Sequence, residues 1–100
     1  HVDGVGKIIK LESVGENNIL AIKPPDSLMR YIAKKGSIAV NGVSLTVNLI
    51  TKDGGFEVNL IPHTLEVTTF REIKIGMEVN LEIDMFARYT EQLLTSVFTE

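Results

Sequence analysis

Two hydroxyl side chains stand two positions apart in the otherwise apolar stretch NGVSLTVN at 41–48. Because side chains alternate between the two sides of a β-strand, Ser44 and Thr46 are expected on one face and the leucine and valines on the other. A face with hydroxyl groups can hydrogen-bond a ligand, or it can simply meet water, as one side of an antiparallel strand commonly does. Taken alone, the alternation favours the solvated face.

Few other side chains suggest chemistry. The two histidines, His1 and His63, have no Asp or Glu at ligand spacing, so no metal site is expected, and His63 is interpreted as a loop histidine in water. Asp84 ends an apolar strand pattern just before a helical one, where Asp commonly caps the helix. The pair Gly4 and Gly6 is too short for a dinucleotide fingerprint and indicates a bulge or a close backbone approach.

Strand patterns dominate the first four-fifths of the chain. Apolar and β-branched runs separated by turn signals predict six strands, at 2–10, 18–23, 37–41, 43–51, 56–61 and 78–84. The Asn-Gly pair that follows the third run is the strongest short-range hairpin signal in the sequence. Six short strands in so small a chain favour a closed β-barrel, because closure removes the exposed edges of an open sheet.

Two helices are also expected. Asp26 or Ser27 is well placed to cap a helix of about two turns that Gly36 would end. From Met85 the stretch MFARYTEQLLTSVF lacks Gly and Pro, and it predicts an amphipathic helix. Its apolar stripe recurs at intervals of three and four: Phe86, Tyr89, Leu93 and Val97. That helix could plug its own barrel or turn the stripe toward another chain, and the pattern favours neither.

Composition narrows the class of protein. One hundred residues with 44% hydrophobic content suit one small folded domain, and the absence of cysteine excludes disulfides, thiolate metal sites and a cysteine nucleophile. A net charge of −3 with interspersed signs lacks the basic stripe that nucleic-acid binding requires. No apolar run approaches the ~20 residues of a membrane span, so a cytoplasmic protein with no membrane partner is expected.

Four stretches follow one another along the chain: HVDGVG at 1–6, KGSIAVNGVSLTVN at 35–48, LIPHTLEVTTF at 60–70 and GMEVNLEIDMFARYTEQLL at 76–94. In this order and spacing they make the chain resemble the C-terminal, lumazine-binding barrel of the riboflavin synthase family. The resemblance implies an all-β fold, a six-stranded antiparallel Greek-key β-barrel over 1–84. It also implies that the helix within 85–100 serves oligomerisation.

The resemblance also implies a reaction. Enzymes of this family take two molecules of 6,7-dimethyl-8-ribityllumazine and move a four-carbon unit from one to the other. Riboflavin and 5-amino-6-ribitylamino-pyrimidinedione result, with no metal and no other cofactor. Since a methyl group on the electron-poor pteridine is already acidic, the protein mainly holds two copies in the right orientation. Related lumazine proteins bind the chromophore without turnover, so the alternatives are a non-catalytic lumazine or flavin carrier and a purely structural barrel.

Site residues are implied by the same motifs. Ser44 and Thr46 would hydrogen-bond the lumazine, and Lys35 would reach its ribityl end. Asp84, the candidate catalytic residue, corresponds to a family position near the pocket, beside its role as a helix cap. The implied substrate-binding residues are His1, Val2, Lys35, Ser44, Leu45, Thr46, Asn59, Leu60, Ile61, Pro62, His63 and Thr64.

The family's active site is shared between subunits. A synthase subunit has two such barrels, and this chain resembles only the second. The N-terminal barrel of one subunit and the C-terminal barrel of its neighbour form each site within a homotrimer. The resemblance therefore implies a chain that holds one lumazine or riboflavin and needs a partner barrel for turnover, with the last helix at the trimer contact.

Overall fold

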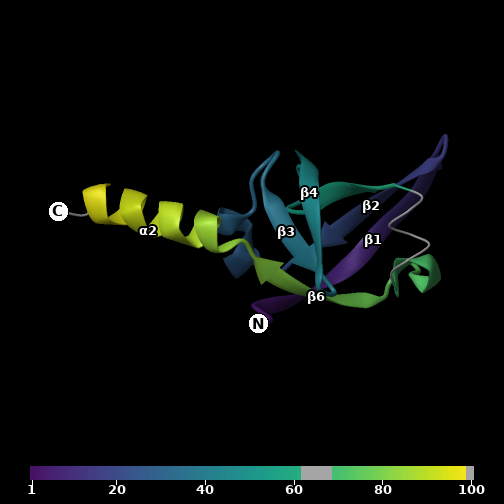
Figure 1. Cartoon of the computed structure of the whole chain (residues 1–100), viewed down its shortest axis with the longest axis horizontal. Coiled ribbons are helices and arrows are strands. Elements are labelled where there is room, and N and C mark those ends of the chain that lie inside the picture. Colours follow the sequence, from purple (N-terminus) through teal and green to yellow (C-terminus); the bar gives the residue numbers. More distant parts are fainter. Residues whose placement is uncertain (62–68, 99–100) are drawn as a thin grey trace.

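Six strands close into an antiparallel barrel in the part of the chain that the structure describes, residues 1–61 and 69–98 of a computed structural model (Figure 1). Around the barrel the strands follow the order β1-β2-β5-β4-β3-β6. Their bounds are β1 Gly4–Val14, β2 Asn17–Lys23, β3 Ser37–Val40, β4 Val43–Ile50, β5 Phe56–Leu60 and β6 Glu78–Ile83. The predicted closed barrel is confirmed, with β6 completing it between β3 and β1.

The turns explain how neighbouring strands pair. Asn41 and Gly42 both have positive φ, 48° and 83°, as a two-residue hairpin turn of the I′ type requires, and they join β3 to β4. The first hairpin is longer than predicted, since β1 stays paired with β2 as far as Val14 and Asn17. Gly15, with φ 62°, begins the turn between them.

The barrel interior is filled by the inward-facing side chains of every strand. In β4 the side chains of Leu45 and Val47 are buried, whereas Ser44 and Thr46 are exposed, so the predicted alternation is confirmed. Fully burying one aliphatic or aromatic side chain contributes about 1.5–3 kcal/mol. The largest fully buried side chains are Phe56, Phe70, Ile8, Leu20, Ile22, Ile38, Leu60, Leu81, Val40, Val47 and Val58.

A glycine in β1 lets the strand pass close to the core. A β-carbon at Gly6 would lie 2.7 Å from Cγ2 of Ile22 and 2.8 Å from Cδ1 of Leu81. The predicted close approach is therefore confirmed. The shift in register between β1 and β2 lies further along, between Ile8 and Lys10.

The predicted short first helix is present, but it is of another type and ends earlier than predicted. The segment forms a short 3-10 helix, η1 (Asp26–Tyr31), and the residue at its N-cap is Pro25 rather than Asp26 or Ser27. The chain turns extended at Ile32, with φ −105° and ψ 117°, well before Gly36. Ile32 is only 8% exposed and belongs to the core, so burying its side chain takes precedence over a further helical turn.

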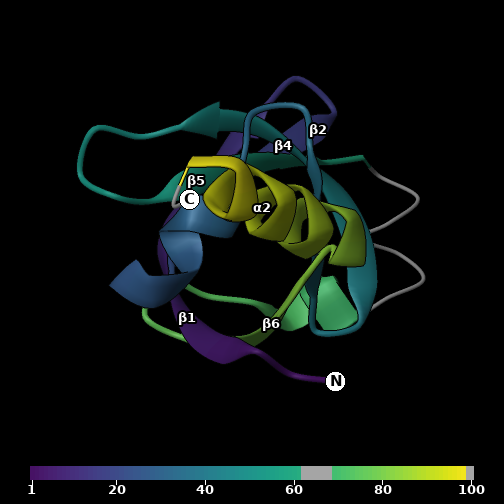
Figure 2. The ribbon, with the colours of Figure 1, turned by 90° about the vertical axis from the view of Figure 1, so that its left-hand side faces the viewer.

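The second helix, α2 (Met85–Phe98), begins and ends as predicted. It continues away from β6 and makes the molecule 48 Å long but only 26 Å by 22 Å across; Figure 2 views it almost end-on. Its stripe does not pack onto the barrel, because Phe86 is 77% and Tyr89 is 59% exposed. The plug alternative is therefore wrong. Within the described residues, no helix is long and apolar enough to cross a membrane.

Candidate functional site

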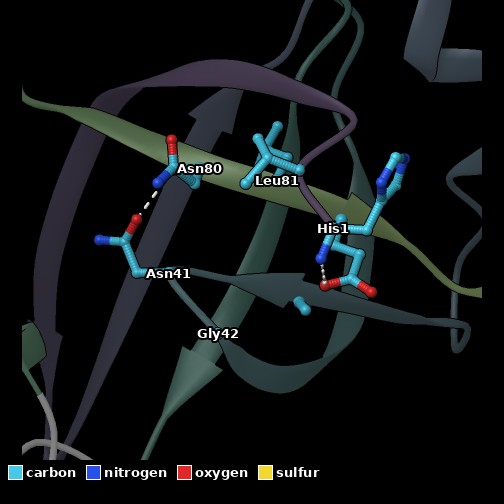
Figure 3. A pocket seen from close by; sticks show the side chains of 8 residues that line it. His1, Asn41, Gly42, Asn80 and Leu81 are labelled. Atoms are coloured by element: carbon cyan, nitrogen blue, oxygen red, sulfur yellow. Dashed lines mark hydrogen bonds and ion pairs between the residues drawn. The ribbon is translucent and has the colours of Figure 1, made fainter.

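Two open hollows lie next to each other on the outer face of the barrel, over β3 and β6. The first, about 490 Å³, is drawn in Figure 3 and is lined by His1, Val2, Asn41, Gly42, Asn80 and Leu81. The second, about 350 Å³, is lined by Ser37, Ile38, Ser44, Ile83, Asp84 and Met85. Both hollows also include Ala39 and Glu82, so we treat them as one outer groove.

Strand pairing builds the middle of this groove. Ala39 of β3 is paired with Ser44 on one side and with Glu82 on the other. Its neighbours Ile38 and Val40 are buried in the barrel, so the small side chain of Ala39 faces outward. A methyl group flanked by a hydroxyl and a carboxylate gives a low floor with polar edges, which suits a flat ligand with a few polar atoms.

One end of the groove is held by a pair of asparagines. The Asn80 backbone N–H donates to Oδ1 of Asn41 at 2.8 Å, and the Asn41 N–H donates to the Asn80 carbonyl at 2.9 Å (Figure 3). These two hydrogen bonds link the β3–β4 turn to β6. They fix the turn that closes this end, where the first hollow includes Gly42.

The other end of the groove lies at the junction of β6 and α2. Asp84 caps the helix as predicted, since its Oδ1 accepts a hydrogen bond from the Phe86 N–H at 3.3 Å and its carbonyl accepts from the Ala87 N–H at 3.0 Å. Asp84 also lines the groove. Its roles as helix cap and as groove residue are therefore compatible, because only one carboxylate oxygen takes part in the cap.

Behind this junction lies a carboxylate that the sequence analysis did not single out. The side chain of Asp3 is only 4% exposed; its Oδ2 accepts from the Ile83 N–H at 2.7 Å and its Oδ1 accepts from the Arg88 guanidinium at 2.5 Å. The hydrogen bond from the Ile83 N–H lowers the pKa of Asp3 below its ordinary value of 3.8, and Arg88 lowers it further. The carboxylate is therefore charged at neutral pH.

The structure brings together four of the residues that the sequence analysis singled out. His1 and Val2 line the first hollow, and Ser44 and Asp84 line the second. They come from the start of the chain, from β4 and from the end of β6. Strand order explains this, because β3 is paired with both β4 and β6, and β1 lies directly beyond β6.

Three other predicted residues lie near the groove without lining it. Thr46 is exposed and paired with the groove residue Ser37. Asn59 is exposed on β5 one position beyond Val58, which pairs with Val47, so antiparallel register puts Asn59 beside Thr46 on the outer face. Lys35 is exposed and has φ 70° in the turn before β3.

The remaining predicted residues divide into two groups. The side chains of Leu45 and Leu60 are buried in the barrel, at 9% and 0% exposure, so only their main-chain groups can meet a ligand from outside. Ile61 follows β5 and is 51% exposed. Pro62, His63 and Thr64 lie outside the described residues.

Ala39 and Glu82, which line both hollows, were not among the predicted site residues, because an alanine or a glutamate on the outer face of a strand is common and indicates no particular site. Strand alternation alone indicates that each faces outward. Their meeting depends on the pairing of β3 with β6, strands that are far apart in sequence. Only knowledge of that pairing could have identified them.

Comparison with known proteins identifies the family. A family profile described as "Lumazine binding domain" matches residues 1–84. The chain belongs to this family. The resemblance to a lumazine-binding barrel, which the four sequence motifs indicated, is thereby confirmed.

Curated relatives of this lumazine-binding domain are named riboflavin synthase. The protein of Brucella abortus is 45% identical over 93 residues, which cover 93% of this chain and 46% of that protein. The protein of Mycobacterium tuberculosis is 42% identical over 98 residues, 96% of this chain and 49% of that protein. The chain thus spans about half the length of the curated relatives it matches.

Solved structures agree with this assignment. LumP complexed with 6,7-dimethyl-8-(1'-D-ribityl) lumazine superposes on the lumazine-binding domain with a TM-score of 0.75 at 32% identity, covering 83% of this chain and 45% of that one. LumP complexed with flavin mononucleotide gives a TM-score of 0.78 at 30% identity, covering 86% and 48%.

Proposed function

We propose that this chain is the C-terminal, substrate-binding half of a riboflavin synthase and that it holds one molecule of 6,7-dimethyl-8-ribityllumazine in the outer groove. The observation that carries the proposal is the single groove lined by His1, Val2, Ser44 and Asp84, in a domain whose curated relatives are named riboflavin synthase. Solved relatives with lumazine, riboflavin or flavin mononucleotide bound support the class of ligand.

In this proposal the flat ring lies over Ala39. The hydroxyl groups of Ser44 and Thr46 meet the polar edge of the ring, together with main-chain groups of Leu45 and of residues 59–61. Lys35, at the turn before β3, reaches the ribityl hydroxyls. The apolar floor excludes water from one side of the ring, so these few polar contacts determine how the ring is oriented.

The chemistry needs little from the protein beyond position. A methyl C–H of the lumazine loses its proton, and the electron pair is delocalised into the electron-poor pteridine. We propose Asp84 as the carboxylate that accepts this proton, since it lines the groove and uses only Oδ1 in capping α2. A second lumazine must then lie against the first for the four-carbon unit to move, and holding both is the main catalytic effect.

The second lumazine is proposed to come from a partner barrel. A synthase of the expected length would supply an N-terminal barrel from a neighbouring subunit of a homotrimer. The exposed apolar stripe of α2 supports a role in that assembly, since Phe86, Tyr89 and Leu93 are each more than half exposed. The 85–100 segment is thus proposed as the oligomerisation element beside the 1–84 barrel.

The proposal also includes the connectivity of the barrel and the location of the protein in the cell. Greek-key connectivity is supported by the strand order, in which β3, β4 and β5 are successive neighbours and β6 returns to lie beside β3. A cytoplasmic location is also part of the proposal, and the absence of cysteine from the whole sequence is compatible with it.

A non-catalytic lumazine or flavin carrier is the second candidate, favoured by the likeness to LumP with ligand bound. A fluorescence titration of the chain with 6,7-dimethyl-8-ribityllumazine, followed by riboflavin analysis with and without an N-terminal synthase barrel, separates the two. Riboflavin formed when the barrels are combined is expected for a synthase half. Saturable binding that never leads to product would indicate the carrier, and a failure to bind would contradict both.

A further inference from the structure

Asp3 connects three separate parts of the molecule. Its Oδ2 accepts a hydrogen bond from the Ile83 N–H at 2.7 Å, its Oδ1 accepts one from Arg88 at 2.5 Å, and the same Oδ1 lies 3.4 Å from Nε2 of His1. Ile83 ends β6, Arg88 belongs to the first turn of α2, and His1 precedes β1. One carboxylate therefore holds the start of the chain against the junction of β6 and α2.

Because the side chain of Asp3 is buried, its carboxylate needs these hydrogen bonds and this ion pair. A carboxylate that is 4% exposed must be paired and hydrogen-bonded, because an unpaired buried charge costs several kcal/mol. The first turn of a helix disfavours a cation such as Arg88, since the helix dipole is positive there, and α2 has no acidic residue in that turn. Asp3 compensates for this by supplying the negative charge from outside the helix.

The contacts of Asp3 reach residues of both hollows of the outer groove. Ile83 and the next residue, Asp84, line the second hollow, and His1 lines the first. Asp3 itself lines neither hollow. Its carboxylate instead fixes the backbone of Ile83, the residue before the helix cap, and faces the imidazole of His1 in the first hollow.

Arg88 extends the connection to α2 and η1. Its guanidinium carbon lies 5.1 Å from the ring centroid of Tyr31, within the range of a cation–π contact. Arg88 is therefore held between the carboxylate of Asp3 and an aromatic ring of η1. A movement of the Ile83–Asp84 corner would displace Asp3 and, with it, the first turn of α2.

We propose that Asp3 is a positioning residue for the outer groove, which sets the placement of His1 and Asp84 and, through Arg88, couples ligand binding to the orientation of α2. This inference rests on the proposed function. Because coupling between two sites is reciprocal, lumazine in the groove would stabilise one orientation of the helix, and a fixed helix would strengthen lumazine binding.

A second ion pair provides the matched control. Arg30 of η1 and Glu91 of α2 form an ion pair that also fastens the helix to η1. Neither residue lines the outer groove, and neither contacts Asp3 in the interactions described for it. Glu91→Gln therefore removes a partly exposed ion pair of α2, whose loss costs little, and leaves the contacts of Asp3 with Ile83, Arg88 and His1 in place.

The test measures lumazine affinity by fluorescence for the full chain and for Asp3→Asn, Arg88→Met, the double variant and Glu91→Gln. Asp3→Asn and Arg88→Met are each expected to weaken binding about tenfold, the scale of one hydrogen bond to a charged group. The double variant is expected to lose no more than either single one, since residues that act as a unit are not additive. Glu91→Gln is expected to bind within about twofold of the original chain.

A spectroscopic measurement separates positioning from general loss of structure. On saturation with lumazine, the NMR resonances of the Arg88 guanidinium are expected to shift in the original chain and to stay still in folded Asp3→Asn. An unchanged affinity in folded Asp3→Asn, a tenfold loss of affinity in Glu91→Gln, or Arg88 resonances that do not shift in the original chain would each overturn the inference.

If the original chain fails to bind lumazine, the proposed function fails. Hydrogen exchange then tests the positioning by Asp3 separately. Faster exchange of the Ile83 amide in Asp3→Asn would support the positioning of the Ile83–Asp84 corner, and unchanged exchange would overturn it.

Discussion

Ala39 and Ser44 are directly paired across the β3–β4 ladder, and both line the outer groove. Ala39 has room above it because its methyl group is the whole of its side chain. Ala39→Leu should fill the floor of the groove and lower lumazine affinity by at least about tenfold, since a ring and a leucine cannot occupy the same volume. The barrel should stay folded, because the added atoms point outward.

Ala33→Leu is the control for that variant. Ala33 is exposed in the turn before β3 and lines neither hollow of the outer groove. Isothermal titration of both variants with the lumazine tests the position of the floor. Equal affinities in Ala39→Leu and Ala33→Leu would mean that the ring does not lie over Ala39.

The hydroxyl group of Thr46 can be removed without changing the shape of its side chain. Thr46→Val should weaken lumazine binding about three- to tenfold, the range for one net hydrogen bond, with little change in stability. Fluorescence titration together with thermal unfolding measures both effects. Ser13→Ala removes a hydroxyl from an exposed position on β1 and should bind as the original chain does. If Thr46→Val binds lumazine with unchanged affinity, the Thr46 hydroxyl contacts water and not the ligand.

Gly6 leaves no space for a side chain between β1 and the core. Gly6→Ala should destabilise the domain by about 1–3 kcal/mol, because the added methyl group would press against Ile22 and Leu81. Denaturant unfolding gives the change in the free energy of unfolding. Val5→Ala, at the exposed neighbouring position, should cost no more than about 0.5 kcal/mol. Similar losses in the two variants would argue against the close packing at Gly6.

Acid should remove the stabilisation that Asp3 provides. The folded-state pKa of Asp3 is lower than its ordinary value of 3.8, so its contribution is fully present above that pH and is lost as the pH falls through the folded-state pKa. Arg88 and His1 are the cationic or titratable side chains that face it in the described contacts. The difference in Tm between the original chain and Asp3→Asn should shrink as the pH falls below 4. A difference that grows below pH 4 would contradict this assignment.

The apolar stripe of α2 should control self-association. Leu93→Lys places a charge in the middle of the exposed stripe and should shift the chain toward monomer, because a buried unpaired ammonium opposes association. Analytical ultracentrifugation across a range of concentrations measures this. Gln92→Lys adds the same charge beside the stripe, at an exposed position, and should leave the association unchanged. A chain that is monomeric at every concentration before substitution would exclude the stripe as a self-contact.

Local signals in the sequence were sufficient for most of the elements. Asn41-Gly42 specified a hairpin turn because few residues accept positive φ at both positions. The alternation around Leu45 specified which side chains of β4 are buried. The stretch from Met85 specified a helix because its period of three to four needs no tertiary contact to be recognised.

Local signals failed where burial decided between alternatives. The segment after Pro25 has a helical pattern, but the chain leaves the helix at Ile32 because that side chain completes the core. The sequence likewise did not decide the direction of α2, since the same amphipathic pattern is expected for a helix that packs on the barrel and for one that projects from it. The structure leaves Phe86 and Tyr89 exposed.

The sequence by itself determined the strands and the hydroxyl face at Ser44 and Thr46, because alternation and turn chemistry act between neighbouring residues. The family resemblance came from the order of its four motifs. Only the tertiary structure decided that His1, Ala39 and Asp84 share one groove, and that Asp3 lies behind it. These residues meet through the pairing of β3 with β6 and of β6 with β1. Strand order in a closed barrel is set by long-range packing, which no short stretch of sequence encodes.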